Sequence, residues 1–423
     1  MFEPVLSKAA RQLGIDQVEF HKINAPSGTA AYGPANDEGV RRRVTSANVS
    51  EALDLGSKLF NWEERKQRSG QRNGTKVTGV GVSVSPYVGG SLGYDGLLVI
   101  QPDGKMYVKS GIGNLGTHSV FDTTRAACEV LDFPWEDVSV AWGDTSKNLP
   151  WSASQGGSQS THAHTRANWA AGLDAKRKLQ EIAARDLGGA PENYDVGGGR
   201  VYHRSNRSRY LTFARAARRA IQLGGKYDGH ELPEDINPFT VKSATNLAGQ
   251  GLMGIARDNF GRDGDTYTFV IGFAEVEVDV ETGHIRVVEY AAAADCGVIL
   301  HPRSLGGQIN GGSVQGFGHA LNQRWVYDQH WGLAVAKRFY SNKPPTILDV
   351  PHNMKWGALD LPDPQTPVGA KGIGEPPQGA GAGAVLSAVA DATGDVLRTP
   401  VTPDMILSSL EVGPDRQFTA HLG

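Results

Sequence analysis

The chain has 423 residues, a length that corresponds to two or three domains of ordinary size. Hydrophobic residues make up 39%, charged residues make up 21% and the formal net charge is -3. This composition excludes a disordered, coiled-coil or collagen-like chain, and it indicates no nucleic-acid partner. Glycine is the exception, because 54 of the 423 residues are glycine, well above the usual share of about 7%. Many backbone positions must therefore need positive φ or must lie very close to another group.

Cysteine content and apolar runs limit the classes of protein further. The two cysteines, Cys128 and Cys296, are too few for a four-cysteine zinc site or an iron–sulfur cluster, so any cluster would belong to another chain. The first residues lack a basic segment followed by an apolar one, and no stretch approaches the roughly 18 consecutive apolar residues of a membrane span. We therefore expect no membrane span and a cytoplasmic location by default, with export on a partner left open.

The first 75 residues predict polar helices. Apolar residues recur at helical spacing over 7–15 and 48–60, and Ser50 before Glu51 predicts an N-cap. The basic run 41–44 is interpreted as a solvated turn. The pattern changes at about residue 76, where two strands joined by a Pro-Asp-Gly turn are followed by a helix and a further strand. These four elements are predicted at 77–90, 97–110, 117–131 and 138–144.

The second half of the chain also mixes helices with strands. Helices are predicted at 161–187, where two glycines end the helical pattern, and at 210–223, and a loop is predicted at 233–239. Residues 266–295 show the clearest hairpin, with a Thr-Gly turn. Residues 306–321 are interpreted as a glycine-rich helix start, and Thr402 followed by Pro403 predicts the last helix. The predicted fold class is therefore α+β, with mixed sheets and packed helices.

The segment 111–116, GIGNLG, is a formal G-x-G-x-x-G between a predicted strand and a predicted helix. In a dinucleotide-binding fold, a pyrophosphate would lie at the N-terminus of the following helix, and Asp132 or Asp137 would bind the ribose. One hypothesis is therefore an NAD-dependent dehydrogenase. The alternative is a glycine turn that binds no ligand.

Two further groups of residues are weaker candidates. His162 and His164 lie two positions apart on a predicted helix, so their side chains point to nearly opposite faces and cannot share a metal ion. Seven arginines between residues 200 and 219 could contact phosphates. The net charge of -3 and the absence of a nucleic-acid motif favour a subunit contact or a solvated face instead.

The segment 367–394 is the most informative part of the sequence. It places Glu375 before Pro376 and Pro377, which fit the first turn of a helix, so the carboxylate would lie beside a partly positive N-terminus. Glycines at 379, 381 and 383 would each cost that helix about 1 kcal/mol relative to alanine, a cost that close packing would explain. Glu375 is either a cap of its own helix or a catalytic group.

Taken in order, these segments resemble the C-terminal part of the molybdenum-binding subunit of the xanthine oxidase family. KGIGEPP (371–377) is similar to the loop that carries the family's catalytic base, and that role would fall on Glu375. SQGGSQS (154–160), GGQINGGSVQGFG (306–318) and IGNLGTHS (112–119) resemble its pterin-binding segments, and the last resemblance replaces the NAD interpretation. The cofactor-binding residues implied by the resemblance are Gly113, Asn114, Leu115, Gly116, His118, Gly157, Ser158, Ser160, Gln308, Lys371, Gly372 and Gly374. Leu115 stands where the family usually has glutamine.

The resemblance also implies a cofactor and a reaction. Molybdopterin, with its cytosine dinucleotide form left open, would hold a molybdenum ion without any ligand from this chain. The metal would act as a Lewis acid in the hydroxylation of an aldehyde or N-heterocycle carbon with oxygen from water, and Glu375 would accept a proton. A non-catalytic scaffold is the alternative that keeps this fold without its chemistry.

The resemblance further implies partners and domains. The family's subunit is nearly twice as long, so the chain is expected to be one piece of a split subunit. A second chain would supply the N-terminal half, and iron–sulfur clusters and FAD would lie on further partner chains. Residues 1–75 would end the first molybdopterin-binding domain, and residues 76–423 would form the second, in two parts split near 225–240.

Overall fold

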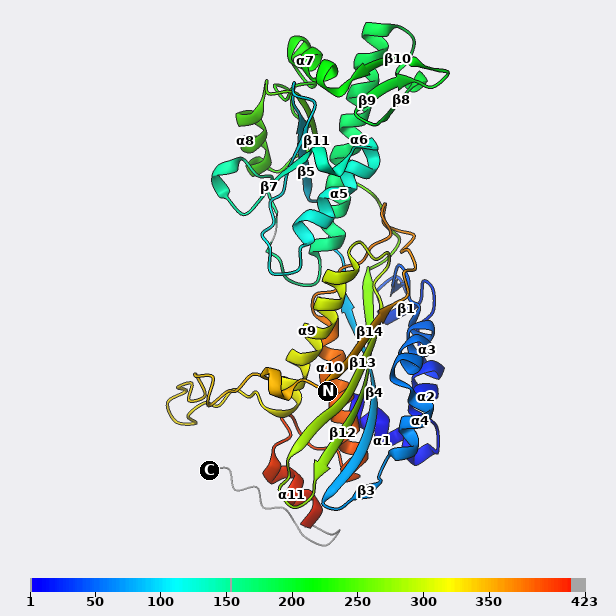
Figure 1. Ribbon diagram of the computed structural model, residues 1–423, viewed down its shortest axis with the longest axis vertical. Helices are drawn as coiled ribbons and strands as arrows, with labels where there is room; N and C mark the ends of the chain where they lie inside the picture. Colours follow the sequence, from blue (N-terminus) through cyan, green and yellow to red (C-terminus); the bar gives the residue numbers. More distant parts are fainter. Residues whose placement is uncertain (1, 153, 412–423) are drawn as a thin grey trace. The chain divides into compact units, whose positions relative to one another are not determined.

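The computed structural model describes residues 2–152 and 154–411, and the chain forms two compact units (Figure 1). Unit 1 comprises the described residues of Met1–Tyr87, Tyr267–Leu361 and Ile373–Gly423, and unit 2 comprises those of Val88–Thr266 and Pro362–Gly372. Each unit combines helices with β-sheet. The predicted α+β class is therefore confirmed.

Unit 1 is built on a five-stranded sheet in the order β14-β13-β12-β4-β3. The strands are β3 (Arg72–Asn73), β4 (Lys76–Val88), β12 (Tyr267–Asp279), β13 (Ile285–Asp295) and β14 (Asn353–Ala358). β12 and β13 form the predicted antiparallel hairpin, in which Phe269 pairs with Asp295 and Val278 pairs with Ile285. β14 lies parallel to β13. A small separate sheet pairs β1 (Ala31–Ala35) with β2 (Arg41–Arg43).

Helices cover both faces of this sheet (Figure 1). On one face lie α9 (Pro302–Leu321) and α10 (Pro376–Thr393), packed on residues such as Val270 and Ala274. On the other face, Ile271 and Phe273 of β12 pack in a core with Leu53. The helices of that second layer are α2 (Gln17–Asn24), α3 (Val49–Phe60) and α4 (Trp62–Arg65). The remaining helices of unit 1 are α1 (Glu3–Leu13), which packs on α10, and α11 (Pro403–Glu411).

Glycines bring α10 unusually close to its neighbours. A Cβ on Gly81 of β4 would lie 2.3 Å from the backbone nitrogen of Ala388, and a Cβ on Gly381 would lie 2.4 Å from the carbonyl oxygen of Ser313 in α9. Side chains cannot occupy such gaps, so these positions require glycine. The glycines of 306–318 also lie inside α9, which begins at Pro302, so the prediction that they mark a helix start is wrong.

Unit 2 contains a four-stranded sheet in the order β11-β5-β6-β7. Its strands are β5 (Asp95–Ile100), β6 (Met106–Lys109), β7 (Val138–Ala141) and β11 (Leu252–Arg257). The helix α5 (Ser119–Leu131) connects the parallel strands β6 and β7, and α6 (Ser160–Leu187) packs on α5, β5 and β11. A Cβ on Gly96 of β5 would lie 2.0 Å from the carbonyl oxygen of Ala167, so glycine again lets a helix approach a strand.

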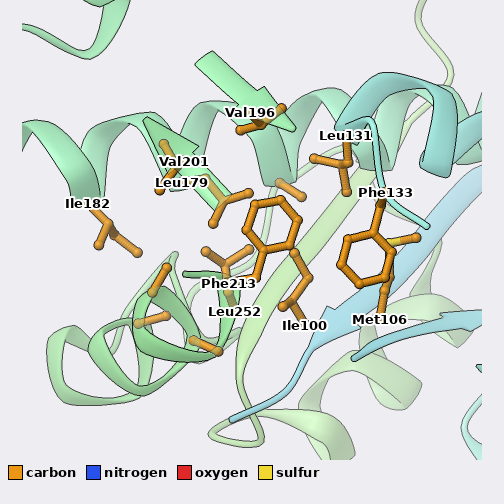
Figure 2. Close-up of a cluster of buried hydrophobic side chains, with 14 of the residues drawn as sticks. Ile100, Met106, Leu131, Phe133, Leu179, Ile182, Val196, Val201, Phe213 and Leu252 are labelled. Carbon is orange, nitrogen blue, oxygen red and sulfur yellow. The ribbon is translucent and has the colours of Figure 1, made fainter. Parts of the chain in front are cut away.

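The rest of unit 2 comprises a second, smaller sheet and two helices. A three-stranded sheet is formed by β8 (Tyr194–Gly197), β9 (Arg200–His203) and β10 (Asn206–Thr212), and it is followed by α7 (Phe213–Leu223) and α8 (Pro238–Leu247). Figure 2 shows Phe133 and Phe213 in the cluster that also buries Leu179 of α6 and Leu252 of β11. The two phenyl rings stack with centroids 5.5 Å apart. Short 3-10 turns lie in unit 2 at Trp135–Asp137, Thr145–Lys147 and Pro191–Asn193, and in unit 1 at Lys66–Arg68 and Ile347–Asp349.

Several predicted boundaries differ from the structure. α3 begins at Val49 after Asn48, two residues before the position that Ser50 as N-cap would give. Residues 41–43 form a strand rather than a turn, because they pair with β1. The helix predicted at 210–223 begins only at Phe213, since the Thr212 hydroxyl accepts a hydrogen bond from the Arg215 amide and caps it. The loop predicted at 233–239 ends where α8 starts at Pro238.

None of the helices in the described ranges has both the length and the apolar character that crossing a bilayer requires.

Candidate functional site

The first candidate segment is the loop 110–118 of unit 2, which links β6 to α5. The side-chain oxygen of Asn114 accepts hydrogen bonds from the amides of Gly116, at 2.9 Å, and His118, at 3.2 Å. Asn114 therefore shapes the loop, and His118 has positive φ (57°) immediately before α5. Leu115 is 69% exposed, and a Cβ on Gly116 would meet no described atom within 4 Å.

The second candidate segment, residues 154–160, precedes α6 in unit 2. The carbonyl oxygen of Ser154 accepts hydrogen bonds from the amide of Gly156 and the side-chain nitrogen of Gln159, each at 3.0 Å. Gly157 and Ser158 have positive φ, at 70° and 52°, and Ser158 is buried. Gly156 and Gly157 are exposed with open space around them among the described residues, and Ser160 is the first residue of α6. The turn thus presents exposed backbone beside a buried serine.

These two segments lie next to each other in unit 2. The Ser152 hydroxyl donates to the carbonyl oxygen of Gly111 at 2.8 Å, and a Cβ on Gly113 would lie 3.4 Å from the side-chain oxygen of Gln155. A Cβ on Gly111 would lie only 2.3 Å from the carbonyl oxygen of Pro150. The first glycine of GIGNLG is therefore needed for packing against the second segment.

The third candidate segment, residues 362–372 of unit 2, is held against the second. The amide of Gly372 donates to the carbonyl oxygen of Gly89 at 2.7 Å, and a Cβ on Gly372 would lie 1.5 Å from the carbonyl oxygen of Ser158. Lys371, next to it, is only 2% exposed. Predicted cofactor residues that are more than 200 positions apart in the chain, Ser158 and Gly372, are thus brought into backbone contact.

Arg166 of α6 was not predicted, although it fixes this third segment. Its guanidinium is fully buried and donates to the carboxylate of Asp258 at 2.7 Å, to the carbonyl oxygen of Gln365 at 3.0 Å and to that of Phe260. A buried arginine is stable only when paired in this way. Its position in an alanine-rich helical stretch gave no sequence signal that distinguished it from a surface arginine.

In unit 1, Gln308 contacts the segment that carries the predicted base. The side-chain nitrogen of Gln308 in α9 donates to the carbonyl oxygen of Gly374 at 2.6 Å. Two residues further along α9, Asn310 has a buried side-chain oxygen without a hydrogen bond among the described residues. A Cβ on Gly312 would lie 2.8 Å from Pro377, so α9 supports the chain on both sides of Glu375.

Glu375 immediately precedes α10 and is half-buried. Its side chain accepts no capping hydrogen bond from the first turn of the helix, and Pro376 leads that turn as predicted. The interpretation of Glu375 as a cap of its own helix is therefore wrong. The partly positive N-terminus of α10 nevertheless favours the ionised carboxylate there.

The two candidate histidines are buried in unit 2. The Nδ1 atom of His162 hydrogen-bonds the backbone of Ser91, and its Nε2 atom lies 3.3 Å from the Thr266 hydroxyl. The ring of His164 lies 5.3 Å from that of Tyr94. Across the described ranges, no group of three or more His, Cys, Asp or Glu side chains is arranged to hold a metal ion. Both histidines are packed against other protein groups, which is the environment of a structural residue.

Burial makes these histidines sensitive to acid. It lowers the pKa of His162 from 6.5 to about 4, with Arg166 adding repulsion, and it alone lowers the pKa of His164 from 6.5 to about 4. In the unfolded chain these histidines take up protons near pH 6.5, whereas in the folded chain they do so only near pH 4. The free energy of unfolding is therefore highest above pH 6.5 and falls as the pH is lowered toward 4. Each buried histidine should account for a loss of about 3 kcal/mol over this range. Denaturant titrations from pH 7 to 4.5 should show that the free energy of unfolding falls less in His164→Leu than in the unmodified protein. The exposed control His284→Leu should lose as much as the unmodified protein.

The arginines of residues 200–219 are engaged within unit 2. Arg219 pairs with Asp186 at 2.9 Å, Arg218 donates to the carbonyl oxygen of Pro102 at 2.9 Å, and Arg200 lies over the ring of Tyr210. These contacts favour the predicted subunit contact or solvated face over a phosphate site.

The candidate segments of unit 2 combine exposed backbone with hydroxyl donors that suit a phosphate-bearing pterin. A ligand can approach the exposed backbone at Gly116, Gly156 and Gly157 closely, while the amides of Gly116 and Gly156 donate to oxygens of their own turns. Lys109, two residues before Gly111, has a pKa lowered by burial and by the charge of Lys147. Two neighbouring ammonium groups therefore favour an anion near this loop. The residues present fit such a cofactor.

The comparisons with known proteins agree with this donor set. The family model of the molybdopterin cofactor-binding domain matches residues 55–351. The chain is 29% identical over 412 residues to the aldehyde oxidoreductase molybdenum-binding subunit PaoC of Escherichia coli K12, covering 96% of this chain and 50% of that protein. It is 26% identical over 407 residues to the putative xanthine dehydrogenase molybdenum-binding subunit XdhA of the same strain, covering 95% and 50%.

A solved structure shows the same fold. Quinoline 2-oxidoreductase from Pseudomonas putida 86 superposes with a TM-score of 0.77 at 25% identity, over 97% of this chain and 51% of that one. The chain thus spans about half the length of the relatives it matches. The predicted relationship to the molybdenum-binding subunits of the xanthine oxidase family is confirmed, and the chain belongs to the molybdopterin cofactor-binding domain family.

Proposed function

We propose that this chain is the molybdopterin-binding half of a molybdenum hydroxylase that oxidises an aldehyde or an N-heterocycle with oxygen from water. The observation that carries the proposal is the position of Glu375, which stands half-buried at the N-terminus of α10, directly after the carbonyl of Gly374 that Gln308 holds. The printed names of the relatives support the substrate classes, since they include an aldehyde oxidoreductase, a xanthine dehydrogenase and a quinoline 2-oxidoreductase.

The residues of unit 2 would bind the cofactor. A phosphate of the cofactor would approach the exposed backbone at Gly116, Gly156 and Gly157, and the serine hydroxyls of 158 and 160 would bind polar edges of the pterin. When bound, the cofactor supplies a molybdenum ion that acts as Lewis acid and two-electron acceptor. The remaining proposed contacts are those of Gly113, Asn114, Leu115, His118, Lys371 and Gly372.

The residues of unit 1 would handle the proton. Glu375 would accept the proton of the water-derived nucleophile, and its ionised form is favoured by the N-terminus of α10. Gln308 holds the carbonyl of Gly374, the residue before Glu375, so it would fix the backbone from which the base extends. Its side-chain oxygen would remain for the cofactor.

Electrons would leave through partner chains. Both cysteines are buried, and burial raises the pKa of Cys128 to about 12, which keeps its thiol protonated. Two cysteines are also too few for an iron–sulfur cluster. We therefore place iron–sulfur clusters and FAD on further chains. Another polypeptide would supply the half of the subunit that the relatives have in addition. The cofactor would be molybdopterin, and its cytosine dinucleotide form is part of the same proposal.

An isotope experiment tests the reaction class. The purified complex is given a panel of aldehydes and N-heterocycles with an artificial electron acceptor, and each heterocycle that is turned over is repeated in ¹⁸O-labelled water. The expected product carries the label, and the boiled complex serves as control. A product that takes its oxygen only from O₂, or hydride transfer to NAD without hydroxylation, would contradict the proposal.

A further inference from the structure

The segment 323–349, here called the arm, connects α9 to β14 in unit 1 and extends away from the sheet of that unit (Figure 1). It carries nine of the 23 large hydrophobic side chains that are exposed in the described ranges. These nine are Trp325, Tyr327, Trp331, Leu333, Val335, Phe339, Tyr340, Ile347 and Leu348. So dense a set of exposed apolar side chains is unusual for a surface that faces only water.

The arm is held in shape by its own hydrogen bonds. The amide of Val335 donates to the carbonyl oxygen of Val326 at 2.7 Å, which pairs the two sides of a hairpin. At its tip, the Asp328 carboxylate accepts from the amides of His330, at 3.1 Å, and Trp331, at 2.6 Å. Its second half is tied to the first, because the amide of Arg324 donates to the side-chain oxygen of Asn342 at 3.1 Å. The exposed side chains are therefore presented from an ordered backbone.

The charges of the arm narrow the choice of partner. Arg324, Lys337 and Arg338 form no salt bridge with any described residue, whereas Lys343 and Asp349 lie 3.8 Å apart and pair with each other. The arm thus combines aromatic anchors with two arginines, residue types that are enriched in protein interfaces, and with a lysine suited to the polar rim. The surface that fits it has apolar pockets with carboxylates at their rim.

We propose that the arm is the docking surface for the polypeptide corresponding to the other half of the relatives' length. The inference rests on the proposed function, which takes this chain as one half of a two-part subunit. It is supported by coverage, since the chain spans about half of each relative, and by the family model, whose match over residues 55–351 includes the arm. A second copy of this chain and a lipid surface are the competing occupants.

Site-specific cross-linking tests the proposal in the native complex, purified through a tag on the full chain. A photoreactive phenylalanine is placed at Trp331 or Phe339, and as controls at Ile23 and Phe239, which are similarly exposed outside the arm. Arm positions are expected to cross-link to a sequence that aligns with the unmatched half of the relatives, and the control positions are not. Cross-links from the arm to a second copy of this chain, or none in an intact complex, would overturn the proposal.

A double variant measures the strength of the contact. Phe339→Ser with Tyr340→Ser should weaken binding of the purified full chain to the cross-linked partner by a factor of about 30 or more, because aromatic anchors dominate interface affinity. The matched control Ile23→Ser with Phe239→Ser should change it less than about twofold. Both pairs should leave the melting temperature unchanged, since all four side chains are exposed.

Two further readouts separate the competing explanations. The chain should not float with vesicles of phosphatidylcholine and phosphatidylserine, and flotation that the arm variant abolishes would overturn the proposal in favour of a lipid surface. Molybdenum content and substrate turnover are measured on the same complex. Arm cross-links in a complex without molybdenum would refute the proposed function alone, and molybdenum without arm cross-links would refute the docking surface alone.

Discussion

Glu375→Gln is expected to lower the turnover number by about 10²- to 10⁴-fold, the range that a positioned general base contributes. Glutamine keeps the size of the side chain but cannot accept a proton at neutral pH. The fold should tolerate the change, because the side chain keeps its size and the loss of its charge near the helix N-terminus costs at most about 1 kcal/mol. Steady-state kinetics and molybdenum analysis on the same preparation check both expectations.

The matched control for this variant is Glu51→Gln, an exposed glutamate in the first turn of α3. It also removes one carboxylate from the start of a helix, and it should leave turnover and metal content unchanged. Full turnover in Glu375→Gln would remove the assigned base. A loss of molybdenum that parallels the loss of activity would instead assign Glu375 to cofactor retention.

Gly372→Ala is expected to have the second large effect. Its Cβ would lie 1.5 Å from the carbonyl oxygen of Ser158 and 3.1 Å from that of Gly89, and neither backbone atom can move aside by a change of rotamer. The third segment must separate from the second, which should destabilise unit 2 by about 1–3 kcal/mol or more and lower the pterin and molybdenum content. Denaturant unfolding and cofactor analysis of the purified complex measure the two effects.

Gly311→Ala is the control for a glycine-to-alanine change. Gly311 is an exposed residue inside α9, its Cβ would meet no described atom within 4 Å, and its φ is not positive. Alanine there should leave cofactor content unchanged and raise stability by about 0.5–1 kcal/mol. If Gly372→Ala behaved like this control, the close contact between the second and third segments would be contradicted.

Local patterns predicted most elements of the fold. The alternation of apolar residues and the Thr-Gly turn predicted the hairpin β12–β13, and a pair of glycines predicted the end of α6 at Leu187. Boundaries were less accurate where pairing or capping with residues elsewhere decides the structure. Arg41–Arg43 became a strand only because β1 supplies a partner, which the run of arginines itself does not indicate.

The glycine excess shows where sequence reasoning needed the structure. The sequence linked much of it to loops around one cofactor, and the open backbone at Gly116, Gly156 and Gly157 agrees with that interpretation. The glycines of α9 and α10 have another cause, since Gly381 lies against the backbone of Ser313 and Gly81 lies against that of Ala388. Composition cannot distinguish a glycine that faces a ligand from one that faces a neighbouring helix.

Local structure at the candidate site was easiest to predict where a motif is contiguous. KGIGEPP and its proline pair placed Glu375 before a helix from the sequence alone, and the structure begins α10 at Pro376. The supports of the site were not predictable, because Arg166 reaches Asp258 and Gln365 through contacts between distant segments. The exposed arm was also missed, since its aromatic residues look like core residues until their surroundings are known.

The most direct test of the central claim is the molybdenum and pterin content of the native complex that contains this chain. Elemental analysis and fluorescence of the oxidised pterin should each give about one equivalent per chain, and Gly372→Ala should lower both while Gly311→Ala leaves both unchanged. A complex that is intact and well folded, yet contains neither molybdenum nor pterin after expression with molybdate, would contradict the assignment of this chain as a molybdopterin-binding half.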